Sequence, residues 1–189
     1  MTQGDQSAFP SMLHYAGPAP DLAEKLALYG RFIGDWTMDV LAYDTDGSTR
    51  EATGSIHFGW VLQGRAIQDI WRIPGYRPGQ PDDTAQSYMF GTTLRVFDPA
   101  LDAWHIIWAD PVRQFYSTQI GRAAGRDIVQ EGTDGKGVAN RWSFTEITDH
   151  SFHWIGEHAP GGEWSKTVEF FVRRAGLSAS TTKEGRKHA

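Results

Sequence analysis

The pattern of hydrophobic and polar residues changes from helical to alternating at about residue 32. Between Asp21 and Gly30, apolar side chains recur on one side of a helix, and Glu24 follows Asp21 at the spacing of a capping box. From Phe32 onward, apolar and polar residues alternate as they do in half-buried strands. The pattern therefore predicts one short helix, capped by Asp21 and ended by Gly30, and only strands after it.

Turn-forming residues divide the alternating region into short segments of regular length. Asp134-Gly135 and Pro160-Gly161-Gly162 are typical of these breaks, because aspartate, glycine and proline suit tight reversals. Antiparallel strands in sequence order favour a closed barrel over a sandwich, because closure removes exposed edges. We predict an all-β fold, an up-and-down antiparallel β-barrel of about ten strands with a short N-terminal helix over one mouth. The predicted strands are 33–43, 49–60, 64–73, 85–97, 102–110, 113–122, 126–132, 138–147, 150–158 and 164–174.

The chain of 189 residues suits one domain of ordinary size. We expect an irregular, proline-containing N-terminal arm over residues 1–20, a single β-barrel domain over 21–175 and a polar, disordered tail over 176–189. The segment 74–84, rich in proline and glycine, is too long for a simple hairpin. It is either a gate at the barrel opening or a surface insertion.

Composition excludes several classes of function. The net charge is -5 and no basic run exceeds Arg173-Arg174, so we expect neither a nucleic-acid nor a membrane partner. The chain has no cysteine, which excludes disulfides, thiolate catalysis and thiolate-bound metals. Neither a His-Glu-x-x-His motif nor a dinucleotide fingerprint occurs, so we expect no metal and no cofactor. Since no segment is typical of a signal peptide or a spanning helix, we expect a cytoplasmic protein.

Aromatic residues are abundant, with 8 Trp, 10 Phe and 6 Tyr. The lumen of a small barrel holds one small ligand, and large rigid rings suit either its core or the walls of an apolar site. We therefore expect the chain to bind a small hydrophobic or aromatic metabolite inside the barrel. The candidate ligand-binding residues are Met38, Trp71, Tyr88, Trp108, Arg141 and Trp154.

Polar residues in mixed strands supply candidates for acid–base chemistry. Asp110 is either a buried acceptor at the mouth or a loop cap before Pro111. Arg141 and Glu157 lie on neighbouring predicted strands; their ion pair orients a carboxylate if it faces inward and contributes only ~0–1 kcal/mol if it faces outward. His153 shares a strand with Glu157, and imidazole titrates near neutrality. The candidate catalytic residues are Asp110, Tyr116, His153 and Glu157.

Several short motifs occur in order over residues 33–174: Gly34-x-Trp36, Tyr43-Asp44-x-Asp46-Gly47, Leu62-x-Gly64-Arg65, Phe97-Asp98-Pro99, Trp104-x-x-x-Trp108-x-Asp110 and Phe170-x-x-Arg173. Together they resemble those of the lipocalin-like (calycin-type) bacterial barrel proteins, a group of uncharacterised function related in fold to lipocalins and fatty-acid-binding proteins. The resemblance implies that Trp36 packs across the closed end with Arg173 or Arg174 over its ring.

Alternatives to a simple binding protein stay open. One is a cofactor-independent lyase, isomerase or cyclase for an aromatic or polyketide-like substrate, with Tyr116 as proton donor and Arg141 as carboxylate anchor. A second is a barrel packed solid that serves a structural or interaction role. A third is haem binding through one histidine, His105, His153 or His158. Outward aromatic residues leave both a homodimer and a monomer open.

Overall fold

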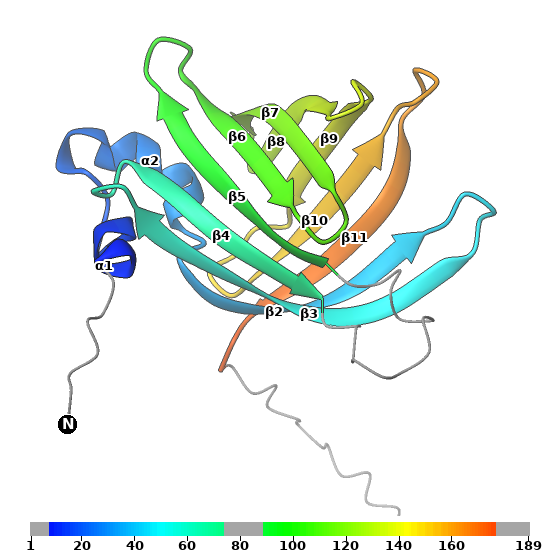
Figure 1. Cartoon of the computed structure of the whole chain (residues 1–189), viewed down its shortest axis with the longest axis horizontal. Helices are drawn as coiled ribbons and strands as arrows, with labels where there is room; N and C mark the ends of the chain where they lie inside the picture. The colour runs from blue at the N-terminus through cyan, green and yellow to red at the C-terminus, as the bar shows by residue number, and fades with distance from the viewer. Residues whose placement is uncertain (1–7, 74–88, 177–189) are drawn as a thin grey trace, which may run out of the picture.

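The computed structural model describes residues 8–73 and 89–176 and forms a closed, up-and-down antiparallel barrel (Figure 1). Each strand pairs with its neighbours in sequence, and β11 pairs with β2 to close the ring. The predicted fold is confirmed. The strands of the barrel are β2 (Gly34–Tyr43), β3 (Thr49–Val61), β4 (Ala66–Ile73), β5 (Met89–Asp98), β6 (Ala103–Asp110), β7 (Phe115–Ala124), β8 (Asp127–Asp134), β9 (Ala139–Thr145), β10 (Ser151–His158) and β11 (Ser165–Arg174).

The observed strands begin and end within a few residues of the predicted ones; the predicted start of β5 (Met89–Asp98), residues 85–88, lies outside the described residues. Local alternation and turn residues therefore suffice to place the strands. The predicted gate or insertion at 74–84, and nearly all of the predicted tail, lie outside the described residues.

The N-terminal segment is more ordered than its sequence indicated. It contains helix α1 (Phe9–Leu13) and the two-residue strand β1 (His14–Tyr15), which pairs with the end of β3. A single 3₁₀ turn, η1 (Pro20–Leu22), then leads into helix α2 (Ala23–Gly30). Among the described residues, neither helix is long or apolar enough to span a bilayer.

The predicted cap of α2 is wrong. Because η1 precedes the helix, Leu22 and not Asp21 occupies the N-cap position, and no side chain caps the helix. Asp21 instead forms an ion pair with Arg65, at 3.0 Å, after the β3–β4 turn. A capping-box spacing thus marked the helix region correctly but misplaced its first turn.

Helix α2 covers one end of the barrel, opposite the β2–β3 and β10–β11 hairpins (Figure 1). Tyr29 is fully buried, with its ring centroid 4.8 Å from that of Trp104, and Gln130 donates a hydrogen bond to its hydroxyl at 3.1 Å. Phe32, directly after the helix, stacks on Phe144 at 5.0 Å. The prediction that the helix covers one mouth is confirmed, and aromatic rings fill that end.

Arg174 holds the end of the last strand over Trp36, as the resemblance implied. Its guanidinium lies 4.2 Å from the indole centroid and donates hydrogen bonds to the carbonyl oxygens of Ile33 and Arg31. Arg173 points the other way and pairs with Asp39 at 2.6 Å. A cation over an indole face contributes on the order of 0.5–2 kcal/mol, so this contact stabilises the closed end.

A buried ion pair crosses the middle of the barrel. The side chains of Asp69 on β4 and Arg95 on β5 are 0% and 1% exposed and are hydrogen-bonded to each other. Asp69 also accepts a bond from the backbone N–H of Thr93 at 2.9 Å, and the Arg95 guanidinium lies 5.1 Å from the Tyr29 ring centroid. The pair separates the ring-filled end of the barrel from the other end.

Candidate functional site

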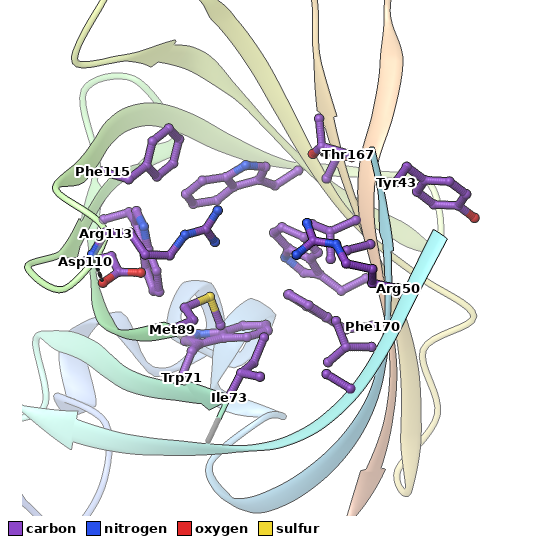
Figure 2. A pocket seen from close by; sticks show the side chains of 18 of the residues that line it. Tyr43, Arg50, Trp71, Ile73, Met89, Asp110, Arg113, Phe115, Thr167 and Phe170 are labelled. Carbon is purple, nitrogen blue, oxygen red and sulfur yellow. Dashed lines mark hydrogen bonds between the residues drawn. The ribbon is translucent and has the colours of Figure 1, made fainter. Parts of the chain in front are cut away.

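The end of the barrel away from α2 contains an open cavity of about 410 Å³ (Figure 2). Four tryptophans and a phenylalanine form its deep wall. Trp154 stacks on Phe170 at 4.8 Å, and Trp71 lies 5.4 Å from the same phenylalanine ring. Trp142 lies 5.7 Å from Trp154 and meets Trp108 edge to face at 6.1 Å. The result is a continuous aromatic surface facing the cavity.

Small residues opposite this wall explain why the space stays open. Val40, Ala42 and Ala52 face the cavity from β2 and β3, where larger side chains would fill it. Gly91 and Gly156 make room for the rings themselves. A Cβ at Gly91 would lie 2.5 Å from the Trp108 ring, and one at Gly156 would lie 2.8 Å from the Trp154 ring. The cavity therefore exists because small residues occupy these inward positions.

Charged groups gather at the mouth of the cavity. Arg50 binds Asp44 through two hydrogen bonds, at 2.8 and 2.9 Å, at the base of the β2–β3 hairpin. Arg113 belongs to the turn between β6 and β7, and His158 ends β10 with its ring 6.0 Å from that of Phe115. Figure 2 shows the guanidinium groups of Arg50 and Arg113 directed over the cavity from opposite sides.

Asp110 lines the cavity, as expected, but its carboxylate serves the turn beside it. One oxygen accepts hydrogen bonds from the backbone N–H groups of Val112 and Arg113, at 3.0 and 3.1 Å, and the residue is 1% exposed. These contacts correspond to the loop-cap interpretation. The side chain fixes the turn that carries Arg113.

Arg141 and Glu157 form the predicted ion pair between β9 and β10, with N–O distances of 2.7 and 3.0 Å. The pair lies on the outer face, because Asn140, Trp142 and their alternating neighbours point inward. The Glu157 hydrogen bond raises the pKa of Arg141, and the guanidinium lies 4.4 Å from the Trp164 ring centroid. An inward role for this pair is therefore wrong.

His153 also faces outward, because the inward positions of β10 are Phe152 and Trp154. Its ring stacks on Phe171 at 4.6 Å, and its Nε2 lies 2.9 Å from a carboxylate oxygen of Glu169, although not in hydrogen-bond alignment. The Tyr43 hydroxyl donates a hydrogen bond to the other carboxylate oxygen of Glu169. Lys166 donates to the oxygen that lies beside His153, at 3.2 Å.

Burial acts to raise the pKa of Glu169, but the hydrogen bonds from Tyr43 and Lys166 and the nearby charges outweigh it, so the pKa lies below its usual value. The hydrogen bond to Glu169 raises the pKa of the Tyr43 hydroxyl. Sequence reasoning missed Glu169. The available signal was a single carboxylate inside the run Val168 to Val172 of β11.

The remaining predicted residues separate into four groups. Trp71, Trp108 and Trp154 line the cavity. Met38 points inward and is buried, but it packs against Gly54 below the cavity. Tyr116 lies on the outer face, 46% exposed, and donates to Gln114 at 3.3 Å, so its expected place in the lumen is wrong. Tyr88 lies outside the described residues.

Sequence reasoning missed several cavity residues, although one signal was available. Trp142 alternates with Arg141 and Ser143, which marks it as inward once β9 is placed. Others missed include Arg50, Arg95, Arg113, Phe115 and Phe170. Of the three histidines considered for haem, His158 lines the cavity. His105 lies outside the barrel against Asp98, at 3.0 Å. Within residues 8–73 and 89–176, no cluster of three histidine or carboxylate side chains is placed to hold a metal ion.

Comparisons with known proteins concern the fold. No family model and no curated protein sequence matches the chain. The crystal structure of Rv2717c from M. tuberculosis superposes with a TM-score of 0.60 at 16% identity, covering 83% of this chain and 98% of that one. The S-type phycobiliprotein lyase CPES from Guillardia theta superposes with a TM-score of 0.55 at 10% identity, covering 81% and 93%. The chain therefore has the fold of the lipocalin-like, calycin-type barrels that its motifs resemble.

Proposed function

We propose that this protein binds a small hydrophobic or aromatic molecule in the open half of its barrel. The observation that carries this proposal is the cavity of about 410 Å³ with its wall of tryptophan rings. Ligand sites typically enclose ~300–1,000 Å³ and combine apolar walls with a few fixed polar groups. This cavity has both features, and it contradicts the alternative of a barrel packed solid.

The shape of the wall favours a flat, apolar ligand. Trp71, Trp154 and Phe170 present ring faces and edges within 4.8 to 5.7 Å of one another, so a planar molecule placed beside them meets several rings at once. Aromatic contacts contribute on the order of 0.5–1.5 kcal/mol each beyond the burial of apolar area. The aromatic wall can therefore bind the inner part of a ligand that carries no charged group there.

Binding is better supported than catalysis. A general acid or base must come within hydrogen-bond reach of the substrate. His153, Glu157 and Tyr116 lie on the outer face of the barrel, and Asp110 is hydrogen-bonded to its own turn. The groups that an acid–base step was expected to use are therefore either outside the cavity or already engaged.

A titration with naphthalene, followed by quenching of tryptophan fluorescence, tests the proposal. We expect saturable quenching in the wild type and its loss in Ala52→Trp, because residue 52 faces the cavity and a large ring there fills it. Thr53→Trp is the matched control, since its side chain lies on the exposed outer face of the same strand. Absence of saturable quenching in the wild type, or equal quenching in Ala52→Trp, would contradict the proposal.

A further inference from the structure

The cavity has charged residues at both ends, but Arg95 at the inner end is neutralised by its ion pair with Asp69. Its deep wall consists of aromatic rings, whereas Arg50, Arg113 and His158 stand at its mouth. A ligand that fills such a space places its apolar body among the rings and its polar group at the mouth. The polar end of the ligand is therefore the part that the mouth residues recognise.

Arg113 differs from the other arginines of the cavity. Arg50 binds Asp44 through two hydrogen bonds, and Arg95 is paired with the buried Asp69. In the part of the chain that the structure describes, no carboxylate forms an ion pair with Arg113. Figure 2 shows its guanidinium turned over the cavity, where the residue is exposed at the mouth.

The backbone around Arg113 is held in place. Asp110 accepts hydrogen bonds from the N–H groups of Val112 and Arg113, and the Gln114 side chain donates to the Pro111 carbonyl at 2.6 Å. The backbone from which the Arg113 side chain extends is therefore held in one conformation. A guanidinium carried on a fixed backbone loses less freedom when it binds an anion than one on an unsupported loop does.

Resting on the proposed function, we infer that the ligand carries a carboxylate and that Arg113 binds it at the mouth. The planar guanidinium matches a carboxylate with two parallel hydrogen bonds. The carboxylates already at the mouth do not compete, since Asp44 is bound by Arg50, Asp110 is bound by its turn, and Glu51 lies in the outward register of β3. The ligand class is an amphipathic monocarboxylate with an aromatic or apolar body.

Two probes with the same body separate the roles of ring and charge. The first is 2-naphthoate, which is ionised at neutral pH, and the second is its neutral methyl ester. In the wild type we expect 2-naphthoate to bind about tenfold more tightly than the ester, measured by tryptophan quenching and calorimetry. In Arg113→Gln we expect the two to bind about equally, with the affinity for the ester unchanged.

Two further variants show whether the preference for the carboxylate depends on the bidentate geometry of the guanidinium or only on its positive charge. Arg113→Lys should keep part of the preference, because an ammonium is a point charge without the bidentate geometry. Arg126→Gln is the matched control, since it removes one positive charge from the exposed β7–β8 turn at the other end of the barrel. It should keep the wild-type preference in full.

The possible failures are distinguishable. If the ester binds but 2-naphthoate shows no advantage, or if the advantage persists in Arg113→Gln, the inference about the carboxylate is overturned and the binding function stands. If Arg126→Gln loses the preference as well, net charge and not Arg113 is responsible, which also overturns it. If neither probe binds to the wild type, the proposed function fails, and this inference fails with it.

Discussion

The two halves of this barrel are built from the same strands and yet differ in what fills them. In the half next to α2, Tyr29 and Phe32 enter from the helix segment and pack against the rings of the strands. In the other half, Trp71, Trp142 and Trp154 line the wall, but no described helix supplies side chains to the middle. The closed half has a core, and the open half has a cavity.

Aromatic content alone therefore does not decide whether a barrel is solid. Both halves are rich in rings, and both alternate inward and outward positions in the same register. The outcome depends on whether a further element plugs the opening and on whether the facing positions are small, as Ala42 and Ala52 are. The same residue type stabilises the fold in one half and forms a candidate binding surface in the other.

The largest expected effect comes from removing matched phenylalanines in the two halves. Phe32→Ala should lower the free energy of unfolding by about 4 kcal/mol, because Phe32 is 1% exposed and packs against Phe58, Phe144 and Phe152. Phe115→Ala, at the half-buried mouth, should cost about 1 kcal/mol or less. Urea denaturation measures both, and equal losses would contradict the division into a core half and a cavity half.

The next effect concerns the ion pair between the halves. Asp69→Ala should destabilise the fold by about 3 kcal/mol, because it leaves Arg95 buried without its partner. The double variant Asp69→Asn, Arg95→Met should be more stable than Asp69→Ala, since it buries no charge and keeps an acceptor for the Thr93 N–H. Chemical denaturation of the two proteins tests this order, and a double variant less stable than the single one would refute it.

A smaller effect is expected in the closed half, where Arg174 covers the ring of Trp36. Arg174→Ala should lower the free energy of unfolding by about 1–2 kcal/mol, because it removes the cation over Trp36 and three hydrogen bonds to backbone carbonyls. Arg174→Lys should recover part of the loss. Thermal melting compares the variants with Arg173→Ala, whose side chain lies on the outer face; an equal loss there would remove the special role of Arg174.

The smallest effect is a pH dependence at the outer face of the open half. The pKa of Glu169 is lower in the folded protein than in the unfolded chain, so its stabilisation is present above the ordinary glutamate pKa and is lost as the pH falls toward the folded value. Glu169→Gln should cost about 1 kcal/mol at neutral pH and progressively less in acid. Urea denaturation over that range is the measurement, with the exposed Glu51→Gln as control; a cost that does not shrink in acid would contradict the pKa direction.

Much of the fold was predictable because it depends on local patterns. Turn residues such as Asp134-Gly135 end strands wherever they occur, and alternation gives the two faces of each strand, as in β2 with Trp36 and Met38 inward. The cap of α2 was not predictable in the same way. Asp21 has the right spacing from Glu24, but the chain forms a 3₁₀ turn there and Asp21 pairs with the distant Arg65.

The candidate site was predictable only in its large aromatic residues. Trp71, Trp108 and Trp154 were identified because large rings favour the inside. Strands with polar residues on both faces gave no local signal, and His153, Glu157 and Arg141 were placed on the wrong side or left open. The face of a polar residue on such a strand depends on the side chains of adjacent strands, as for His153, which stacks on Phe171 and lies beside Glu169 of β11.

The ten barrel strands, their order and the helix that covers one end could be derived from the sequence, because they follow from periodicity and turn chemistry within short stretches of chain. Only the tertiary structure decided that rings fill one half and surround an open space in the other, and that Arg113 is turned over that space. The physical reason is that a cavity depends on side chains from many strands at once, and on the volumes of residues that meet only when the barrel closes.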